Sequence, residues 1–421
     1  MRPTLSLLLF AAILTSCHKN TADQVAQQPP IPNNKNLVWT KTFGGTNYDF
    51  ANAVIQLSNG DFIMAGTTRS VDGDIPAATG GGYDAFLSKV SSTGVKSWIK
   101  LFGANDDDYA TGLAMGTDGG FLVTGYTFLN NLNTAWAVKT DAEGNKQWQK
   151  TLSTSSDAKP ITVIATNDGA YLILGYTSAG GNRDAWLAKI DASGNTVWSK
   201  TYGGNGEDWF TGVVKAADGG YVLSGYTSSS NGDIAHARGN FDGWIMKIDA
   251  SGNKGWSQTF GGSNEDYLKS IIQTNDGGYV AVGYTKSTDG DITLNKGGYD
   301  EWLVKLDAEG SKQWIKTYGG ANEEYMTSIV PTRDGNFLTM GYSNSTTGDV
   351  VRPNNNFSAW LLKFDASGNK VAASTYGYAA TYDNFTNNLI ATQDGGFMLA
   401  GYSYVETRGY DAWLVKIDAI N

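Results

Sequence analysis

The sequence has 421 residues, with 53 Gly, 8 Pro, 1 Cys, 2 His and a net charge of −10. An acidic chain lacks the basic surface that phosphate backbones require, so we expect no nucleic-acid partner. One Cys excludes a disulfide framework, and with two His it argues against a metal site, so we expect no metal and no other cofactor. High Gly with 12% aromatic and 17% charged residues favours a turn-rich, all-β protein.

The N-terminus has the pattern of a bacterial export signal. Arg2 precedes an apolar run from Leu5 to Leu14, which is followed by Thr15, Ser16 and Cys17. The run is too short to span a bilayer, so residues 1–16 are interpreted as a signal peptide. The tetrad that ends at Cys17 resembles the bacterial lipobox, which implies lipidation of that Cys. An ordinary signal peptide with a coincidental Cys is the alternative.

Residues 17–36 contain the expected lipidated Cys and then a polar segment rich in Gln, Asn and Pro. We interpret this segment as a flexible tether between membrane and domain. His18 stands where the inner-membrane retention signal has Asp. This resemblance implies anchoring in the outer membrane, facing the periplasm or the cell surface.

Seven repeats of 50 to 58 residues fill residues 37–421. One recurring segment places its aromatic residue at Phe86, Trp136, Trp186, Trp244, Trp302, Trp360 and Trp413. Each repeat has four short runs of aromatic and β-branched residues, which in the fifth repeat are 267–273, 279–285, 301–307 and 312–318. Asp-Gly turns join these runs as two hairpins. The pattern predicts an all-β, seven-bladed β-propeller with four-stranded blades.

Most of the 13 Trp residues fall in two repeat columns, one in the third run and one in the fourth. Fixed repeat positions are typical of packing residues, and Trp209 lies outside both columns. The chain opens with a fourth-run sequence at 38–45 and ends with a third run at 412–419. The last blade is therefore predicted to be closed by the N-terminal strand, which leaves no free edge. Ala372 replaces a fourth-run Trp and predicts a weaker junction between the sixth and seventh blades.

The repeat resembles a known bacterial family. The stretch from Gly261 to Tyr267, the turn Asp276-Gly277-Gly278, and the stretch from Gly283 to Ser287 are similar to SBBP repeats, and the likeness covers residues 37–421. The resemblance implies an extracytoplasmic seven-bladed propeller and brings over no catalytic residue. In the third repeat, 152–155 departs from the aromatic-Gly-Gly pattern.

One face of the predicted propeller gathers the candidate ligand-binding residues. An acid lies just before the first strand of most repeats, as at Asp208 and Asp266, and an aromatic residue follows, as at Trp209 and Tyr267. A second row ends the second strand, and its members include Tyr226 and Tyr284. Carboxylates beside aromatic rings can bind sugar hydroxyls or cations. The alternative is that the acids cap their own loops and the tyrosines pack between blades.

Longer connections between the second and third strands contain a Gly-Asp pair in repeats one, four, five and six, preceded by Asp72, Asn231, Asp289 and Thr347. They lack EF-hand spacing and are interpreted as turns. We expect those of repeats four to six to form one wall of this face, which includes His236 and Arg238. A sevenfold Lys column, from Lys89 to Lys416, is expected to pair with the turn Asp two residues later.

These features indicate a membrane-anchored lipoprotein that binds or scaffolds a glycan or an envelope protein through this face. The tentative ligand-binding residues are Trp209, Asp208, Asp266, Tyr267, Tyr226, Tyr284, His236 and Arg238, and no catalytic residue is assigned. A polysaccharide hydrolase or lyase that uses the same carboxylates is the alternative. Because each acid recurs in other repeats, the unique environment that acid–base catalysis needs is not evident.

Overall fold

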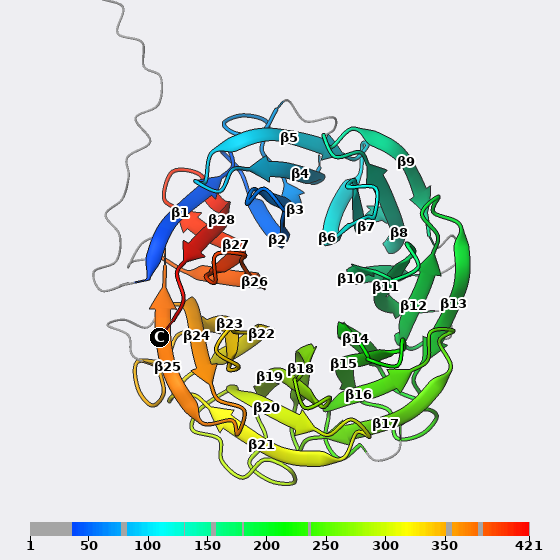
Figure 1. Ribbon diagram of the computed structural model, residues 1–421, viewed down its shortest axis with the longest axis vertical. Helices are drawn as coiled ribbons and strands as arrows, with labels where there is room; N and C mark the ends of the chain where they lie inside the picture. Colours follow the sequence, from blue (N-terminus) through cyan, green and yellow to red (C-terminus); the bar gives the residue numbers. More distant parts are fainter. Residues whose placement is uncertain are drawn as a thin grey trace, which may run out of the picture.

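The computed structural model describes residues 36–76, 82–129, 131–152, 157–178, 181–234, 237–350, 356–377 and 382–420. Its strands form seven four-stranded antiparallel sheets around a central axis (Figure 1). The predicted all-β, seven-bladed β-propeller is confirmed. Among the described residues, no helix is long and apolar enough to cross a membrane.

The blades follow one another along the chain. Within blades 1 to 6, the first strand lies nearest the central axis and each later strand lies farther out (Figure 1). Blades 1 to 3 consist of β2 (Asp49–Gln56), β3 (Phe62–Thr68), β4 (Asp84–Val90) and β5 (Lys96–Phe102); β6 (Asp107–Met115), β7 (Phe121–Leu129), β8 (Leu132–Thr140) and β9 (Lys146–Thr151); and β10 (Ala158–Ala165), β11 (Tyr171–Thr177), β12 (Asp184–Ile190) and β13 (Thr196–Tyr202). Blades 4 to 6 consist of β14 (Asp208–Lys215), β15 (Tyr221–Thr227), β16 (Asp242–Ile248) and β17 (Lys254–Phe260); β18 (Asp266–Gln273), β19 (Tyr279–Thr285), β20 (Asp300–Leu306) and β21 (Lys312–Tyr318); and β22 (Glu324–Pro331), β23 (Phe337–Ser343), β24 (Ser358–Phe364) and β25 (Lys370–Tyr376).

Blade 7 joins the two ends of the chain. It consists of β26 (Asn384–Ala391), β27 (Phe397–Val405), β28 (Gly409–Ile417) and, outermost, β1 (Leu37–Phe43). β1 pairs antiparallel with β28, with Thr40 opposite Val415 and Phe43 opposite Ala412. The predicted closure by the N-terminal strand is therefore confirmed.

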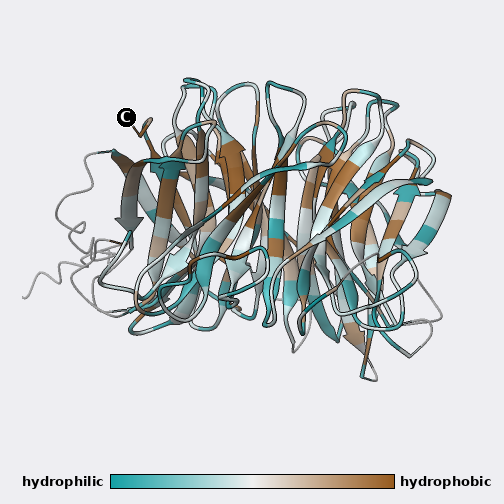
Figure 2. Cartoon of the chain, turned by 90° about the horizontal axis from the view of Figure 1, so that it is seen from below, coloured by the Kyte–Doolittle hydropathy of each residue, from teal (hydrophilic) through white to brown (hydrophobic). Residues whose placement is uncertain are grey.

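The core lies between neighbouring blades. The third-strand Trp side chains are nearly inaccessible to solvent, and Trp244, Trp302 and Trp360 are 0% exposed. Viewed edge-on, the apolar residues lie along the strands and the hydrophilic residues concentrate in the loops at both faces (Figure 2). No single sheet could bury both of its apolar faces, so the ring of blades is what completes the core.

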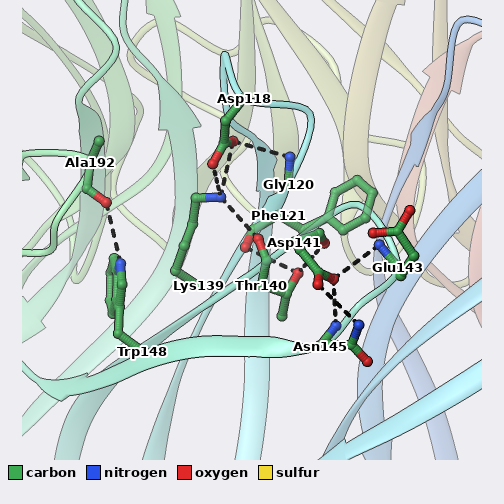
Figure 3. A network of polar contacts seen from close by, with 10 residues as sticks. All are labelled: Asp118, Gly120, Phe121, Lys139, Thr140, Asp141, Glu143, Asn145, Trp148 and Ala192. Carbon is green, nitrogen blue, oxygen red and sulfur yellow. Dashed lines mark hydrogen bonds and ion pairs between the residues drawn. The ribbon is translucent and has the colours of Figure 1, made fainter.

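The fourth-strand Trp of one blade packs on the outer hairpin of the next blade. Trp148 contacts the turn of blade 3 at Gly194, whose φ of +77° favours glycine, and its Nε1 donates to the carbonyl of Ala192 at 3.3 Å (Figure 3). Blade 7 has no such hairpin, because β1 takes the place of its outer strand. Ala372 therefore stands at the one position where a Trp would have no turn to cover. Ile420 packs near Ala372 instead.

The Lys column pairs with a different turn from the predicted one. Lys139 Nζ lies 2.7 Å from Asp118 Oδ2, in the turn between the first and second strands of blade 2 (Figure 3). Asp141, two residues after Lys139, instead accepts hydrogen bonds from the backbone N–H groups of Glu143 and Asn145. The same Lys-to-first-turn pair recurs in every blade, and its members are Lys89–Asp61, Lys189–Asp168, Lys247–Asp218, Lys305–Asp276, Lys363–Asp334 and Lys416–Asp394. The prediction of the Asp partner was wrong because antiparallel pairing places Lys139 opposite Leu122, directly beside the turn between the first and second strands.

Candidate functional site

The innermost strands of the seven blades surround the centre of the ring (Figure 1), and their side chains line a central channel. Every innermost strand carries a β-bulge at the same place, as between Phe210 and Gly212 in β14 and between Leu268 and Ser270 in β18. A bulge leaves one residue unpaired and turns its side chain out of the regular alternation. The seven bulged residues, here called the stitch row, are Asn52, Thr111, Ile161, Thr211, Lys269, Thr327 and Asn387.

Aromatic side chains surround the entrance to this channel. The residue two positions before each bulge belongs to the mouth row, which consists of Phe50, Tyr109, Lys159, Trp209, Tyr267, Tyr325 and Phe385. In blades 2 to 7, each of these pairs with a member of the tyrosine row, which consists of Tyr126, Tyr176, Tyr226, Tyr284, Tyr342 and Tyr402. The two rows form ring contacts from blade to blade, with Tyr226 and Tyr267 4.8 Å apart between centroids.

Trp209 lies in this aromatic belt, as does the rest of the predicted aromatic set. Its ring stacks on Tyr176 at 5.2 Å and 17°, and it contacts Tyr226 at 4.8 Å. Its indole N–H is buried without an acceptor among the described residues. Tyr267, Tyr226 and Tyr284 lie in the same belt. The structure thus brings together all four aromatic residues that the sequence singled out.

Lys159 interrupts the mouth row. The register of blade 3 places Lys159 opposite Tyr176, where the other blades have an aromatic residue, and places Ala158 where they have an acid or amide. The Lys159 ammonium lies over the ring of Tyr126, 4.4 Å from its centroid. Burial lowers its pKa from the ordinary value. The Asp157 carboxylate precedes the strand and accepts a hydrogen bond from the backbone N–H of Asn133 at 2.8 Å.

The stitch row joins neighbouring blades by hydrogen bonds. Thr211 Oγ1 donates to the carbonyl of Leu268 in the next blade at 2.7 Å, and Thr327 Oγ1 is 3.2 Å from that of Thr386. The side-chain amides of Asn387 and Asn52 likewise donate to backbone carbonyls of the next blade, at 3.0 and 2.8 Å. Each acceptor occupies the same position of its own strand. Short polar residues at the bulge therefore hold the inner ring together.

Lys269 occupies the stitch position of blade 5 and makes no such bond. Its Nζ lies between two rings of the tyrosine row, 5.6 Å from the centroid of Tyr226 and 6.0 Å from that of Tyr284. Among the described residues, no carboxylate pairs with it and no oxygen accepts its hydrogen bonds. Burial lowers the pKa of Lys269 to about 8. The two ring contacts are the interactions that hold this ammonium, and no carboxylate or hydrogen-bond acceptor of the described chain adds to them.

The channel contains a cavity of about 570 Å³. Its lining includes Lys159, Lys269 and Trp209, hydroxyl and amide groups of the stitch row, and most of the tyrosine row. No Asp or Glu belongs to this lining, although the whole chain has a net charge of −10. Burial raises the pKa of Tyr284 and raises that of Tyr402 to about 12, so these phenols stay protonated donors. The cavity wall is therefore positive, rich in donors and aromatic.

Asp208 and Asp266 lie outside this cavity and are 0% exposed. The Oδ2 of Asp266 accepts hydrogen bonds from the backbone N–H of Gly262 and from Ser287 Oγ, both at 2.8 Å, and its Oδ1 accepts one from Thr285 Oγ1. Burial raises the pKa of both carboxyls, against these hydrogen bonds, which lower it. The structure thus supports the alternative interpretation for the two acids, in which each caps its own loop.

Arg238 lies at the circumference, away from the other predicted residues. Its guanidinium forms an ion pair with Asp291 of the next blade at 2.9 Å, and Lys312 Nζ, at the start of the outer strand β21, lies 2.5 Å from the same carboxylate. The Asp of each long connection pairs in this way with a Lys at the start of the outer strand, and the wall expected from these loops stays a prediction because part of them lies outside the described residues. Within the described segments, no three His, Cys, Asp or Glu side chains gather as metal ligands. His236 and Cys17 lie outside the described residues.

Lys159 and Lys269 are the channel residues that the sequence interpretation missed. Both stand where a repeat column changes character, from aromatic to Lys at 159 and from Thr or Asn to Lys at 269. Aligning the repeats column by column would have revealed Lys269. Lys159 was hidden because blade 3 lacks the acid that marks the start of the strand in other repeats.

Comparisons with known proteins identify the fold alone. No protein-family model and no curated protein matches the chain. Among solved structures, YCF48 bound to D1 peptide aligns with a TM-score of 0.51 at 10% identity, over 93% of this chain and 98% of that one. The Pan2 WD40 domain of Neurospora crassa aligns with a TM-score of 0.52 at 10% identity, over 92% and 97%. Both are similar in fold, and the likeness to SBBP repeats stays a prediction.

Proposed function

We propose that this chain is an envelope-anchored binding module whose glycan ligand contacts the mouth of the central channel. The observation that supports this best is the aromatic belt with Trp209, which lines a cavity of about 570 Å³. Aromatic faces stack on sugar rings, and phenol hydroxyls donate to sugar oxygens. The volume falls within the range of about 300–1,000 Å³ that small-ligand sites occupy.

The fold is compatible with a binding or scaffolding role. The YCF48 structure contains a bound peptide, so a propeller of similar fold serves as a binding module. An envelope protein is accordingly the other partner class that a binding experiment must include. The hydrolase or lyase alternative gains no support from Asp208 and Asp266, since both are buried and bonded to their own loops.

Replacing Trp209 by Ala tests the proposed function. We expect the affinity for the ligand to fall by about thirtyfold, because loss of an aromatic anchor costs about 2 kcal/mol or more. A glycan array and a pull-down from envelope extract, both with the lipid-free domain, identify the ligand, and calorimetry measures the affinity. Trp209→Tyr is the matched control, since blades 5 and 6 carry Tyr at this position, and it should retain most of the binding. Unchanged affinity in the Ala variant would contradict the proposal.

The proposed address is the outer membrane, through lipid on Cys17. The support is the lipobox-like tetrad and the absence of any other Cys in the chain. Cys17→Ala should move the protein from the membrane pellet to the soluble fraction of cells, as measured by fractionation and immunoblotting. Persistence of the variant in the pellet would refute lipid anchoring at this residue.

A further inference from the structure

We propose that the central channel selects an acidic sugar, whose carboxylate is held by Lys269 while its ring lies against Trp209. The inference rests on the proposed function, in which the channel mouth binds a glycan, and it specifies the ligand's charge. A uronic acid is the chemical class that combines a carboxylate with ring hydroxyls.

The charge of the cavity wall is the first observation that carries the inference. Two ammonium groups line it, at Lys159 and Lys269, and none of its lining residues is acidic. Acids near the entrance lie outside this lining and have partners of their own, as Glu207 pairs with Arg183 at 3.3 Å and Glu265 accepts a hydrogen bond from Tyr299 at 2.6 Å. A negatively charged group is thus the complement that this cavity lacks.

The second observation is that Lys269 replaces a structural residue. Thr or Asn at the equivalent positions of four other blades donates to the carbonyl of the next blade, as Thr211 does to Leu268. The equivalent acceptor for blade 5 is the carbonyl of Met326. Lys269 leaves this hydrogen bond unmade and places an unpaired ammonium in the channel. Within the described residues, blades 2 and 3 also lack this bond to the next blade, so the unpaired cation, rather than the lost hydrogen bond, sets position 269 apart and indicates a role in ligand binding.

The donors around Lys269 suit a monoanion that also carries hydroxyl groups. The hydroxyls of Tyr226, Tyr284, Tyr342 and Tyr402 make no hydrogen bond within the described chain, and burial raises the pKa of all four. The Lys269 ammonium can pair with a carboxylate while these neutral phenols donate to the hydroxyl groups of the same ligand. The aromatic surface beside it, formed by Trp209 on Tyr176, offers a face for the sugar ring.

Calorimetry with an oligosaccharide of glucuronate units and with the matching glucose oligosaccharide tests the inference. We expect the protein to bind the glucuronate form at least about tenfold more tightly, and Lys269→Thr to lose roughly ten- to hundredfold of that affinity. Lys159→Tyr gives blade 3 the aromatic residue that the other blades carry in the mouth row, and this variant should lose less of the affinity for the glucuronate form than Lys269→Thr does. Lys286→Thr is the matched control, since Lys286 is an exposed lysine of the same blade whose ammonium lies over Tyr299, and it should bind as the unchanged protein does.

Folding of the variants is checked by thermal unfolding. Thr at 269 should restore the hydrogen bond to Met326, so the Tm of Lys269→Thr should equal or exceed that of the unchanged protein. A lower Tm would mean that Lys269 is a structural residue, and would overturn the inference.

The remaining outcomes separate the inference from the proposed function. Equal affinity for the glucose and glucuronate forms, with both lost in Trp209→Ala, would overturn the acidic-sugar inference and leave the glycan-binding function standing. Binding of an envelope protein that needs Trp209 but not Lys269 would also overturn the acidic-sugar inference. The ligand of the proposed binding module would then be a protein and not a glycan. Binding to neither sugar, together with a ligand indifferent to Trp209, would overturn both.

Discussion

Deletion of residues 37–43 is expected to destabilise the domain by at least about 5 kcal/mol and to cause aggregation. The deletion removes β1, and with it the buried Phe43 and the ring of Trp39, which meets Phe62 of blade 1 at 6.3 Å. Removal of one large aromatic side chain from a core costs about 3–5 kcal/mol. The deletion also exposes the edge of β28, whose unpaired backbone groups can pair with another molecule. Thermal and denaturant unfolding measure the loss.

A peptide that covers residues 36–45 gives the deletion a direct control. Added to the shortened domain, it should restore the Tm by adding a strand to the exposed edge of β28. The same peptide with Trp39 and Phe43 changed to Ala should not. A deletion of residues 20–34, in the expected tether, should leave the Tm unchanged. Equal Tm values for the complete chain and the chain without residues 37–43 would contradict a stabilising closure by β1.

The architecture could be predicted from the sequence because the same four-strand pattern occurs in seven repeats. The number of blades, the four strands of each and the closure by the N-terminal strand all follow from the spacing of Phe86 through Trp413 and from the fourth-run sequence at the start. The weaker junction was predicted at Ala372 because Ala packs less surface than the Trp of the other repeats. In three dimensions blade 7 has no outer hairpin for a Trp to cover, because β1 is its outermost strand. A local pattern could not show this, since it depends on where the chain ends meet.

The candidate site could be predicted only in part. Trp209, Tyr226, Tyr267 and Tyr284 were found because they repeat or break a repeat, and the structure places them together. Asp208 and Asp266 were included because they precede the aromatic residues, but period-2 alternation points them to the opposite side of the strand. Lys269 lies at a bulge, and this bulge shifts the alternation of side chains between the two faces of the strand. The sequence does not show the bulge, so the direction of the Lys269 side chain could not be predicted from alternation.

In blades 1, 2, 4, 5 and 6, the loop that precedes the innermost strand is built around one buried acid. In blade 5, Asp266 accepts hydrogen bonds from the N–H of Gly262, from Ser287 Oγ and from Thr285 Oγ1. The first glycine of the aromatic-Gly-Gly sequence follows from this arrangement, since a Cβ at Gly261 would come within 2.6 Å of Asp266 Oδ2. Blade 3 has lost both the acid, replaced by Ala158, and the glycine pair. The acid and the glycine pair are lost together because the acid accepts hydrogen bonds from the loop that the glycine pair forms.

Asp266→Ala is therefore expected to destabilise the domain by about 3–5 kcal/mol, since it leaves three buried donors unpaired at about 1–3 kcal/mol each. Asp266→Asn is the matched control. Blade 7 already carries Asn384 at this position, where it accepts a hydrogen bond from Ser403 Oγ at 2.7 Å. The Asn variant should lose less, about 1–3 kcal/mol, because its amide oxygen still accepts on one side while its NH2 group cannot accept from the N–H of Gly262, and it should bind ligand normally. Urea denaturation gives the stability and calorimetry gives the affinity. If Asp266→Asn instead kept its stability and lost its ligand, the carboxylate would be a ligand-binding group, and the acids of this face would have to be counted with the channel after all.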